Sequence, residues 1–116
     1  MKFSKSLKLN HIFQRLYRTS GVANGYVVLY ARKNGTNTNR VGITVSKKLG
    51  HAVVRNRVRR RLRDVYRLNE DKFQSGWDLV VVARSKAVTA EFQKLTAAYL
   101  QLAEKLGVLL PTDGEM

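Results

Sequence analysis

The most distinctive chemistry in this sequence belongs to the segment KKLGHAVVRNRVRRRLRDVYR, from Lys47 to Arg67. Asp64 is its only acid, and its basic residues are Lys47, Lys48, Arg55, Arg57, Arg59, Arg60, Arg61, Arg63 and Arg67. A guanidinium group pairs with phosphate through two parallel hydrogen bonds and stacks on bases. An ordinary solvated helix face mixes charges of both signs, whereas like charges at helical spacing repel unless a polyanion neutralises them. We therefore favour nucleic-acid binding over a bland solvated face.

Apolar residues recur in the same segment at the spacing of an amphipathic helix. The apolar stripe consists of Val54, Val58, Leu62 and Val65. The opposite side carries Asn56, Arg60, Arg63 and Arg67. Arg57 and Arg59 lie near the two edges, and Arg55 lies nearer the apolar stripe. The pattern predicts one helix with a buried aliphatic face and an exposed guanidinium face.

A second source of nucleic-acid chemistry is a pair of aromatic residues near the N-terminus. A short helix is predicted for Leu9 to Thr19, and one apolar row is enough to dock it: Leu9, Ile12 and Leu16. Phe13 and Tyr17 form a second row beside the first. The spacing alone leaves two interpretations open, because these rings could widen the core contact or remain partly exposed as a surface strip.

Residues suited to catalysis are sparse. A metal-dependent nuclease needs converging carboxylates or histidines, and the eight acids are scattered along the chain. His11 and His51 could form an acid and base pair for metal-free RNA cleavage, but both fall near the start of a predicted helix. No phosphate-binding glycine loop, nucleophile elbow or zinc spacing is present. We expect no catalytic residue, and a two-histidine nuclease is the weaker alternative.

The composition points to a polyanionic partner. With 22 Lys and Arg against 8 Asp and Glu, the net charge is +14 on 116 residues. This length suits a single RNA-binding domain over residues 1–116, with one core and no need of metal or disulfides. The sequence has no cysteine, which fits a cytoplasmic location. No apolar run is long enough for a signal peptide or a membrane span, so we expect no membrane partner.

Three strands are predicted around the arginine-rich helix. GYVVLYAR (Gly25 to Arg32) and RVGITVS (Arg40 to Ser46) are joined by the polar turn KNGTNTN, which predicts an antiparallel hairpin. After a loop from Asn69 to Gly76, WDLVVVAR (Trp77 to Arg84) contains a nearly continuous apolar run. Such a run is typical of a central strand covered on both faces.

The C-terminal part of the chain adds a last helix. Thr89 is predicted to cap it, Leu106 to end it and Gly107 to follow it. Residues 108–116 are expected to be a frayed tail. The order helix, hairpin, helix, strand, helix folds most simply as one sheet with helices packed against it, an α+β architecture.

The segment VGITVSKKLGHAVVRNRVRRRLRDVYR resembles the signature of the bacterial ribonuclease P protein subunit. In that family, a strand ending in Val-Ser-Lys-Lys leads through a glycine-containing turn into a helix bearing Arg-Asn-Arg. The similarity extends to Phe13, Tyr17 and Arg18 in the first helix, to NGYVVLYA in the first strand and to DLVVVAR after the arginine-rich helix. These motifs occur in the family's order and separations.

The resemblance implies a fold and a division of labour. The fold would be an α/β sandwich, ribosomal protein S5 domain 2-like, with a left-handed βαβ crossover through the arginine-rich helix. A catalytic RNA would hold the Mg²⁺ ions and hydrolyse the phosphodiester that joins the 5′ leader to mature tRNA. The protein would be the auxiliary subunit of this ribonucleoprotein endoribonuclease, a hydrolase of tRNA processing, with no requirement for a protein oligomer.

The resemblance also assigns residues. Contact with the catalytic RNA is implied for Lys47, Lys48, Arg55, Asn56, Arg57, Arg59, Arg60 and Arg63, and we add Arg67 because it lies on the same face. Phe13, Tyr17 and Tyr30 match aromatics that line a cleft for the single-stranded leader of precursor tRNA, which favours the surface-strip interpretation. Arg61 stands where relatives often carry an aliphatic residue, so it either snorkels or widens the RNA contact. No metal site is assigned to the protein.

The alternative function is generic RNA binding, as in a ribosomal-type protein without any role in processing. A DNA-binding version would need a dimerisation seam or side chains suited to base edges. The arginine-rich helix offers mainly phosphate binders, and recognition of RNA shape through phosphates suits it better.

Overall fold

The computed structural model describes the backbone of residues 4–6, 10–19 and 21–111, and side chains within 14–19 and 21–111. Five strands form one mixed sheet in the order β1-β4-β5-β3-β2. The strands are β1 (Ser4–Ser6), β2 (Val22–Ala23), β3 (Val27–Lys33), β4 (Asn39–Thr44) and β5 (Trp77–Ala83). The α-helices are α1 (Asn10–Tyr17), α2 (Ala52–Asn69), α3 (Lys86–Thr89) and α4 (Phe92–Leu106). Two 3₁₀ turns, η1 (Lys47–Leu49) and η2 (Glu70–Lys72), flank α2.

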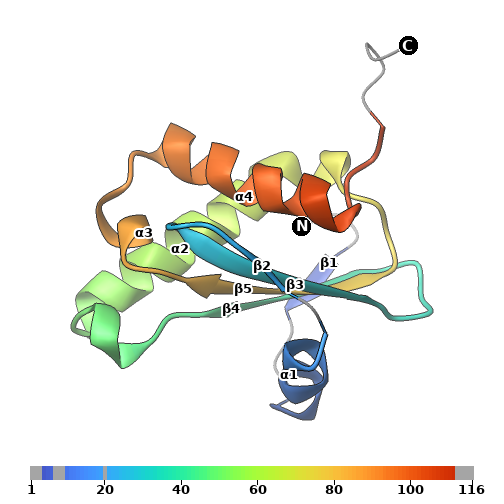
Figure 1. Ribbon diagram of the computed structural model, residues 1–116, viewed down its shortest axis with the longest axis horizontal. Helices are drawn as coiled ribbons and strands as arrows, with labels where there is room; N and C mark the ends of the chain where they lie inside the picture. Colours follow the sequence, from blue (N-terminus) through green and yellow to red (C-terminus); the bar gives the residue numbers. More distant parts are fainter. Residues whose placement is uncertain (1–3, 7–9, 20, 112–116) are drawn as a thin grey trace.

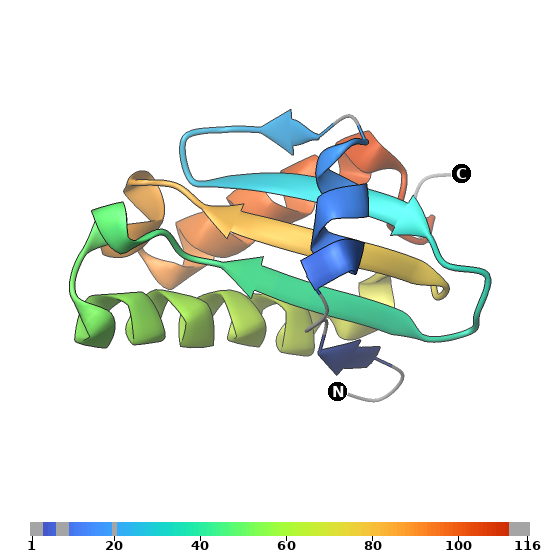
Figure 2. The ribbon, with the colours of Figure 1, turned by 90° about the horizontal axis from the view of Figure 1, so that it is seen from below.

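The sheet has helices on both faces. Helices α2 and α4 lie side by side over one face, and α1 crosses the other face (Figures 1 and 2). Strand residues alternate between the faces, so Leu29, Leu79 and Val81 are fully buried against the α2 and α4 side. The predicted α+β class, a sheet with helices packed against it, is confirmed.

Strand β5 occupies the middle of the sheet, as its continuous apolar run predicts. It pairs antiparallel with β3 and parallel with β4. The predicted hairpin between the strands on either side of KNGTNTN is therefore wrong, because β3 and β4 are separated by β5. Residues 34–38 form a wide turn around the start of β5. There the backbone N–H of Asn34 donates to the backbone carbonyl of Gly76 over 2.9 Å. The Asn-Gly sequence makes a turn here, but not one that joins neighbouring strands.

The connection from β4 through α2 to β5 is left-handed. The two strands are parallel neighbours, and α2 lies on the face away from α1 (Figure 2). Because most such connections are right-handed, this handedness could not have come from the hydrophobic pattern. It agrees with what the family resemblance implies.

The C-terminal region departs from expectation at two places. Thr89 ends the short helix α3, and α4 begins at Phe92 with Glu91 at its N-cap, because Ala90 is extended and separates the two helices. Gly107 ends α4 in the left-handed conformation at φ 75°, as predicted. Residues 108–110 are not frayed: Val108 is fully buried, and Leu110 donates its backbone N–H to the Lys72 carbonyl over 2.7 Å. Residues 112–116 lie outside the described residues.

A buried asparagine joins three elements at one end of the sheet. Asn39, fully buried at the start of β4, donates from Nδ2 to the Tyr66 hydroxyl over 3.1 Å and to the Gln74 carbonyl over 2.9 Å. Its Oδ1 accepts from the backbone N–H of Trp77 over 2.8 Å. The side chain thus fixes β4 to α2 and to the first residue of β5.

Candidate RNA-binding surface

Helix α2 is mounted on the core by the predicted apolar stripe. Val58, Leu62 and Val65 are fully buried, and Tyr66 joins them. Val54, at the first turn, is only half-buried. Burial of this one face fixes the rotation of the helix, so the guanidinium side chains on the opposite face must point to solvent.

The entry into α2 is shaped by Ser46 and Gly50. Ser46 Oγ accepts from the backbone N–H of Lys48 over 3.2 Å and caps the turn η1, which carries Lys47 and Lys48. Gly50 has φ 146°, and a Cβ at this position would lie 3.0 Å from the Cβ of Val54. A glycine is therefore required for the chain to turn closely into the helix, with both lysines held beside its N-terminus.

The predicted contact residues occupy one exposed face, which we call the basic face. Its exposed members are Lys47, Lys48, Asn56, Arg57, Arg60, Arg63 and Arg67. Arg55 and Arg59 are half-buried at its margins. The division agrees with the helical spacing, because Arg55 lies nearer the apolar stripe. Its Nε is buried and has no hydrogen-bond partner among the described residues.

Several members of the basic face already have partners within the protein. Arg59 donates to the side chain of Asn56 over 2.9 Å. Arg67 makes a long 3.5 Å contact with Asp64, and Arg57 donates to the carbonyl of Val88 over 2.9 Å. Among the described side chains, no hydrogen bond or ion pair engages Lys47, Lys48, Arg60 or Arg63. These four cations are the ones with their full capacity available for phosphate.

Arg61 has a structural position that sequence reasoning missed. It is half-buried, and its guanidinium group donates to the carbonyl of Ala90, in the extended link between α3 and α4. Arg57 lies one turn earlier and donates to Val88 in α3, so the two arginines hold α3 and the link after it against α2. The sequence contains no signal for these two contacts. The acceptors are backbone carbonyls that lie 31 residues after Arg57 and 29 residues after Arg61.

Two of the predicted aromatics lie together on the opposite face of the sheet. Tyr17 is 43% exposed, and its ring meets that of Tyr30 edge-on with centroids 5.2 Å apart. The Tyr17 hydroxyl also lies 3.3 Å from Thr44 Oγ1. Tyr30 comes from the middle of β3, and a Cβ on Gly21 would lie within 2.6 Å of its ring. The backbone of Phe13 is part of α1, but its side chain lies outside the described residues.

Among the described side chains of α1, the fully buried Leu16 holds the helix over the sheet. Leu16 packs on Val80 of β5, with Tyr30 and Val82 beside it. This contact confirms part of the predicted docking row, and the side chains of Leu9 and Ile12 lie outside the described residues. Because α1 is fixed through Leu16, the neighbouring Tyr17 is turned toward Tyr30 and Thr44.

The histidines and acids do not converge where the structure describes them. His51 is exposed at the N-cap of α2 without a side-chain capping bond, and the side chain of His11 is outside the described residues. Among the described residues, no three His, Cys, Asp or Glu side chains are grouped so that they could hold a metal ion. No helix in this part of the chain has the length and apolarity needed to cross a bilayer.

These features define a class of protein: a small basic α+β protein with an arginine-rich helix on one side of its sheet and paired aromatic rings on the other. The chain belongs to the ribonuclease P protein family, since the family model described as Ribonuclease P matches residues 1–107. It is 40% identical over 110 residues to the ribonuclease P protein component of Alkaliphilus oremlandii, covering 94% of this chain and 96% of that protein.

Solved structures support the same assignment. The RNase P protein of Staphylococcus aureus superimposes with a TM-score of 0.81 at 31% identity, covering 90% of this chain and 97% of that one. The RNase P protein of Thermotoga maritima gives a TM-score of 0.79 at 30% identity, covering 87% and 96%. Both the family resemblance and the fold expected from it are therefore confirmed.

Proposed function

We propose that this protein docks on the catalytic RNA of ribonuclease P through the basic face of α2. The proposal is carried by one observation: the fully buried stripe Val58, Leu62 and Val65 leaves Arg60 and Arg63 exposed without partners among the described side chains. Guanidinium groups fixed on a rigid helix lose little freedom on pairing with phosphate. Lys47 and Lys48 extend the same charge beyond the N-terminus of the helix.

The aromatic side of the sheet is the proposed site for the 5′ leader of precursor tRNA. Tyr17 and Tyr30 present ring surfaces beside Thr44, and we include Phe13 because it precedes Tyr17 by one helical turn. Aromatic rings hold unpaired bases by stacking, which tolerates any base because every base has a flat face. Leaders that differ between precursor tRNAs could therefore share this site.

The division of chemistry follows from what the described side chains offer. They include no group of three His, Cys, Asp or Glu residues that could hold a metal ion. We infer that the RNA partner holds the Mg²⁺ and that no protein side chain is catalytic. The protein assists endonucleolytic removal of the leader by neutralising phosphate repulsion and by retaining the unpaired strand.

The deciding experiment is cleavage of a 5′-extended precursor tRNA at low Mg²⁺. It compares the protein alone, a bacterial ribonuclease P RNA alone and the two together. Only the mixture is expected to cleave efficiently at the mature 5′ end. Cleavage by the protein alone would contradict the proposal and return His11 and His51 as catalytic candidates. A protein that adds nothing to the RNA would leave generic RNA binding as the better account.

Tyr17→Ala is expected to weaken binding of precursor tRNA to the assembled complex while binding of mature tRNA stays unchanged. Loss of one stacked base is worth about 1 to 3 kcal/mol, or roughly a fivefold to hundredfold weakening. Equilibrium binding of both RNAs to the complex measures the difference. The matched control is Tyr17→Phe, which keeps the ring and removes the hydroxyl that lies 3.3 Å from Thr44 Oγ1. Equal weakening of precursor and mature tRNA by Tyr17→Ala would refute the leader site.

A further inference from the structure

The face of the sheet that carries α1 has a second feature, a row of charged side chains across three strands. Arg32 of β3 and Arg40 of β4 both stand directly opposite Asp78 of β5 in the strand register. Directly paired residues point to the same face. The row therefore places two guanidinium groups on either side of one carboxylate.

Of these two arginines, only Arg40 forms an ion pair with the carboxylate of Asp78. Arg40 Nε donates to Asp78 Oδ1 over 2.7 Å and its Nη2 donates to Oδ2 over 2.6 Å, and this pairing raises the pKa of Arg40. Asn34 Nδ2 donates to the same Oδ1 over 3.0 Å. Asp78 is only 5% exposed, so this pair forms a fixed floor. Arg32, on its other side, has no ion pair or hydrogen bond among the described side chains.

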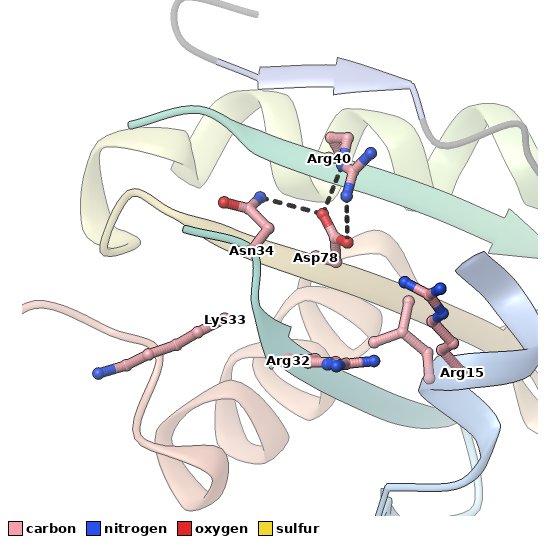
Figure 3. A pocket seen from close by; sticks show the side chains of 7 residues that line it. Arg15, Arg32, Lys33, Asn34, Arg40 and Asp78 are labelled. Atoms are coloured by element: carbon pink, nitrogen blue, oxygen red, sulfur yellow. Dashed lines mark hydrogen bonds and ion pairs between the residues drawn. The ribbon is translucent and has the colours of Figure 1, made fainter. Parts of the chain in front are cut away.

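Helix α1 brings a third arginine to the same place. One pocket of about 150 Å³ is lined by Arg15, Arg32, Arg40 and Asp78, together with Leu16, Lys33 and Asn34. Figure 3 shows Arg15 reaching in from α1 and Arg32 from β3, beside the Arg40–Asp78 pair. Arg15, like Arg32, is exposed and has no hydrogen-bonding partner among the described side chains. Two unpaired guanidinium groups thus border one pocket whose floor, the Arg40–Asp78 pair, is already neutral.

This arrangement favours an anionic ligand over simple solvation. Two like charges that converge repel each other, and long arginine side chains at a free surface can separate to avoid that cost. Here they border a hollow whose floor is rigid. A phosphate group accepts hydrogen bonds from two guanidinium groups at once, which would offset the repulsion between them.

The pocket lies across α1 from the paired tyrosines. Along β4, Thr44 contacts Tyr17, whereas Arg40 lies four residues earlier, about 13 Å away at the rise of a strand. Helix α1 crosses the strands between these two positions (Figure 2). A single strand of RNA on the tyrosine side would reach the arginine pocket by continuing past α1.

We propose that Arg15 and Arg32 bind a backbone phosphate of single-stranded RNA, in the part of the 5′ leader farther from the cleavage site than the bases that stack on Tyr17 and Tyr30. Arg40 and Asp78 act as positioning residues that hold the floor of the site. The proposal rests on the function proposed above and extends it. It makes the leader contact dependent on leader length but independent of leader sequence.

The test is the double variant Arg15→Gln and Arg32→Gln, bound to ribonuclease P RNA. Its affinity is measured for precursor tRNAs whose leader is shortened one nucleotide at a time, and for mature tRNA. We expect roughly tenfold weaker binding for long leaders only, with wild-type affinity once the leader is too short to pass α1. The salt dependence of binding should also fall for long leaders alone.

The matched control is the double variant Lys94→Gln and Lys105→Gln on α4. It removes the same net charge from two exposed positions on the opposite side of the sheet, and neither residue lines the pocket. It should bind every leader as the wild type does. Equal weakening by this control would show that the effect comes from overall charge and would overturn the proposal.

The remaining outcomes distinguish failure of the phosphate site at Arg15 and Arg32 from failure of the leader site proposed above. Weakened binding of mature tRNA or of the catalytic RNA itself would assign the pocket to those RNAs and not to the leader. A double variant that follows the wild type at every leader length would remove the pocket from RNA binding. If the wild-type complex itself binds precursor and mature tRNA equally, it is the leader function as a whole that fails.

Discussion

Replacing Arg60 and Arg63 together with alanine is expected to weaken binding to ribonuclease P RNA and to lower its salt dependence. Each phosphate contact contributes about 0.7 to 0.9 to the slope of log affinity against log salt, so two lost contacts should reduce it by about 1.4 to 1.8. Both side chains are exposed on α2 and have no hydrogen bond or ion pair among the described residues. The fold should therefore be unchanged. Titrations at several salt concentrations measure the effect.

The matched control is the double variant Lys94→Ala and Lys105→Ala on α4. It removes the same net charge from exposed positions of the neighbouring helix on the same side of the sheet. Only a small shift from the general field of the protein is expected there. If both double variants lower the slope equally, or if neither does, the basic face of α2 is not the phosphate contact.

Asn39→Ala is expected to lower the free energy of unfolding by roughly 2 to 5 kcal/mol. The substitution removes three hydrogen bonds and leaves the Gln74 carbonyl and the Trp77 N–H without their partner in the interior. A whole domain of this size is stable by only about 5 to 15 kcal/mol, so the loss is a large fraction. Urea unfolding of the free protein followed by circular dichroism measures it.

Asn37→Ala provides the comparison for this effect. Asn37 is two residues earlier in the chain and exposed, so the same change of residue type should alter stability by less than about 0.5 kcal/mol. Tyr66→Phe, which removes only one of the three hydrogen bonds, should give an intermediate loss. A stability for Asn39→Ala equal to that of Asn37→Ala would show that the buried amide is not what joins β4 to β5.

Helix α2 was the most predictable part of the molecule. Its apolar residues repeat at the helical period and its charges are almost all of one sign, so the spacing alone separated the buried Val58 and Leu62 from the exposed Arg60 and Arg63. The central position of β5 was equally predictable from the sequence, since Leu79 to Val81 form an unbroken apolar run. In both cases the physical cause, burial of one stripe or of both faces, is local to the segment.

Sheet connectivity was less predictable because it is decided between segments. Asn34 and Gly35 form a dipeptide that is typical of a hairpin turn. In the structure, however, β5 lies between β3 and β4 and pairs with both of them. The short strands β1 and β2, of 3 and 2 residues, carry too few residues for any alternation to be recognised. Their positions depend on pairing with β4 and β3.

Some polar roles were also beyond reach from the sequence. Arg57 and Arg61 resemble the other arginines of α2, and only the position of the Val88 and Ala90 carbonyls distinguishes them. Likewise, Arg32, Arg40 and Asp78 are far apart in the chain and meet only through strand register. Residues that act on a ligand and residues that act on the fold have the same side chains here, and their neighbours decide between the two roles.

The central place of β5 also governs the order in which the molecule can assemble. β5 is the last of the described strands along the chain, yet both β3 and β4 pair with it. Until residue 83 has left the ribosome, the two halves of the sheet have no common edge, and their apolar faces stay unpaired. Folding should therefore be a late, cooperative event. A nascent chain that ends before Trp77 should be held by chaperones and remain sensitive to proteases, without a partly formed sheet.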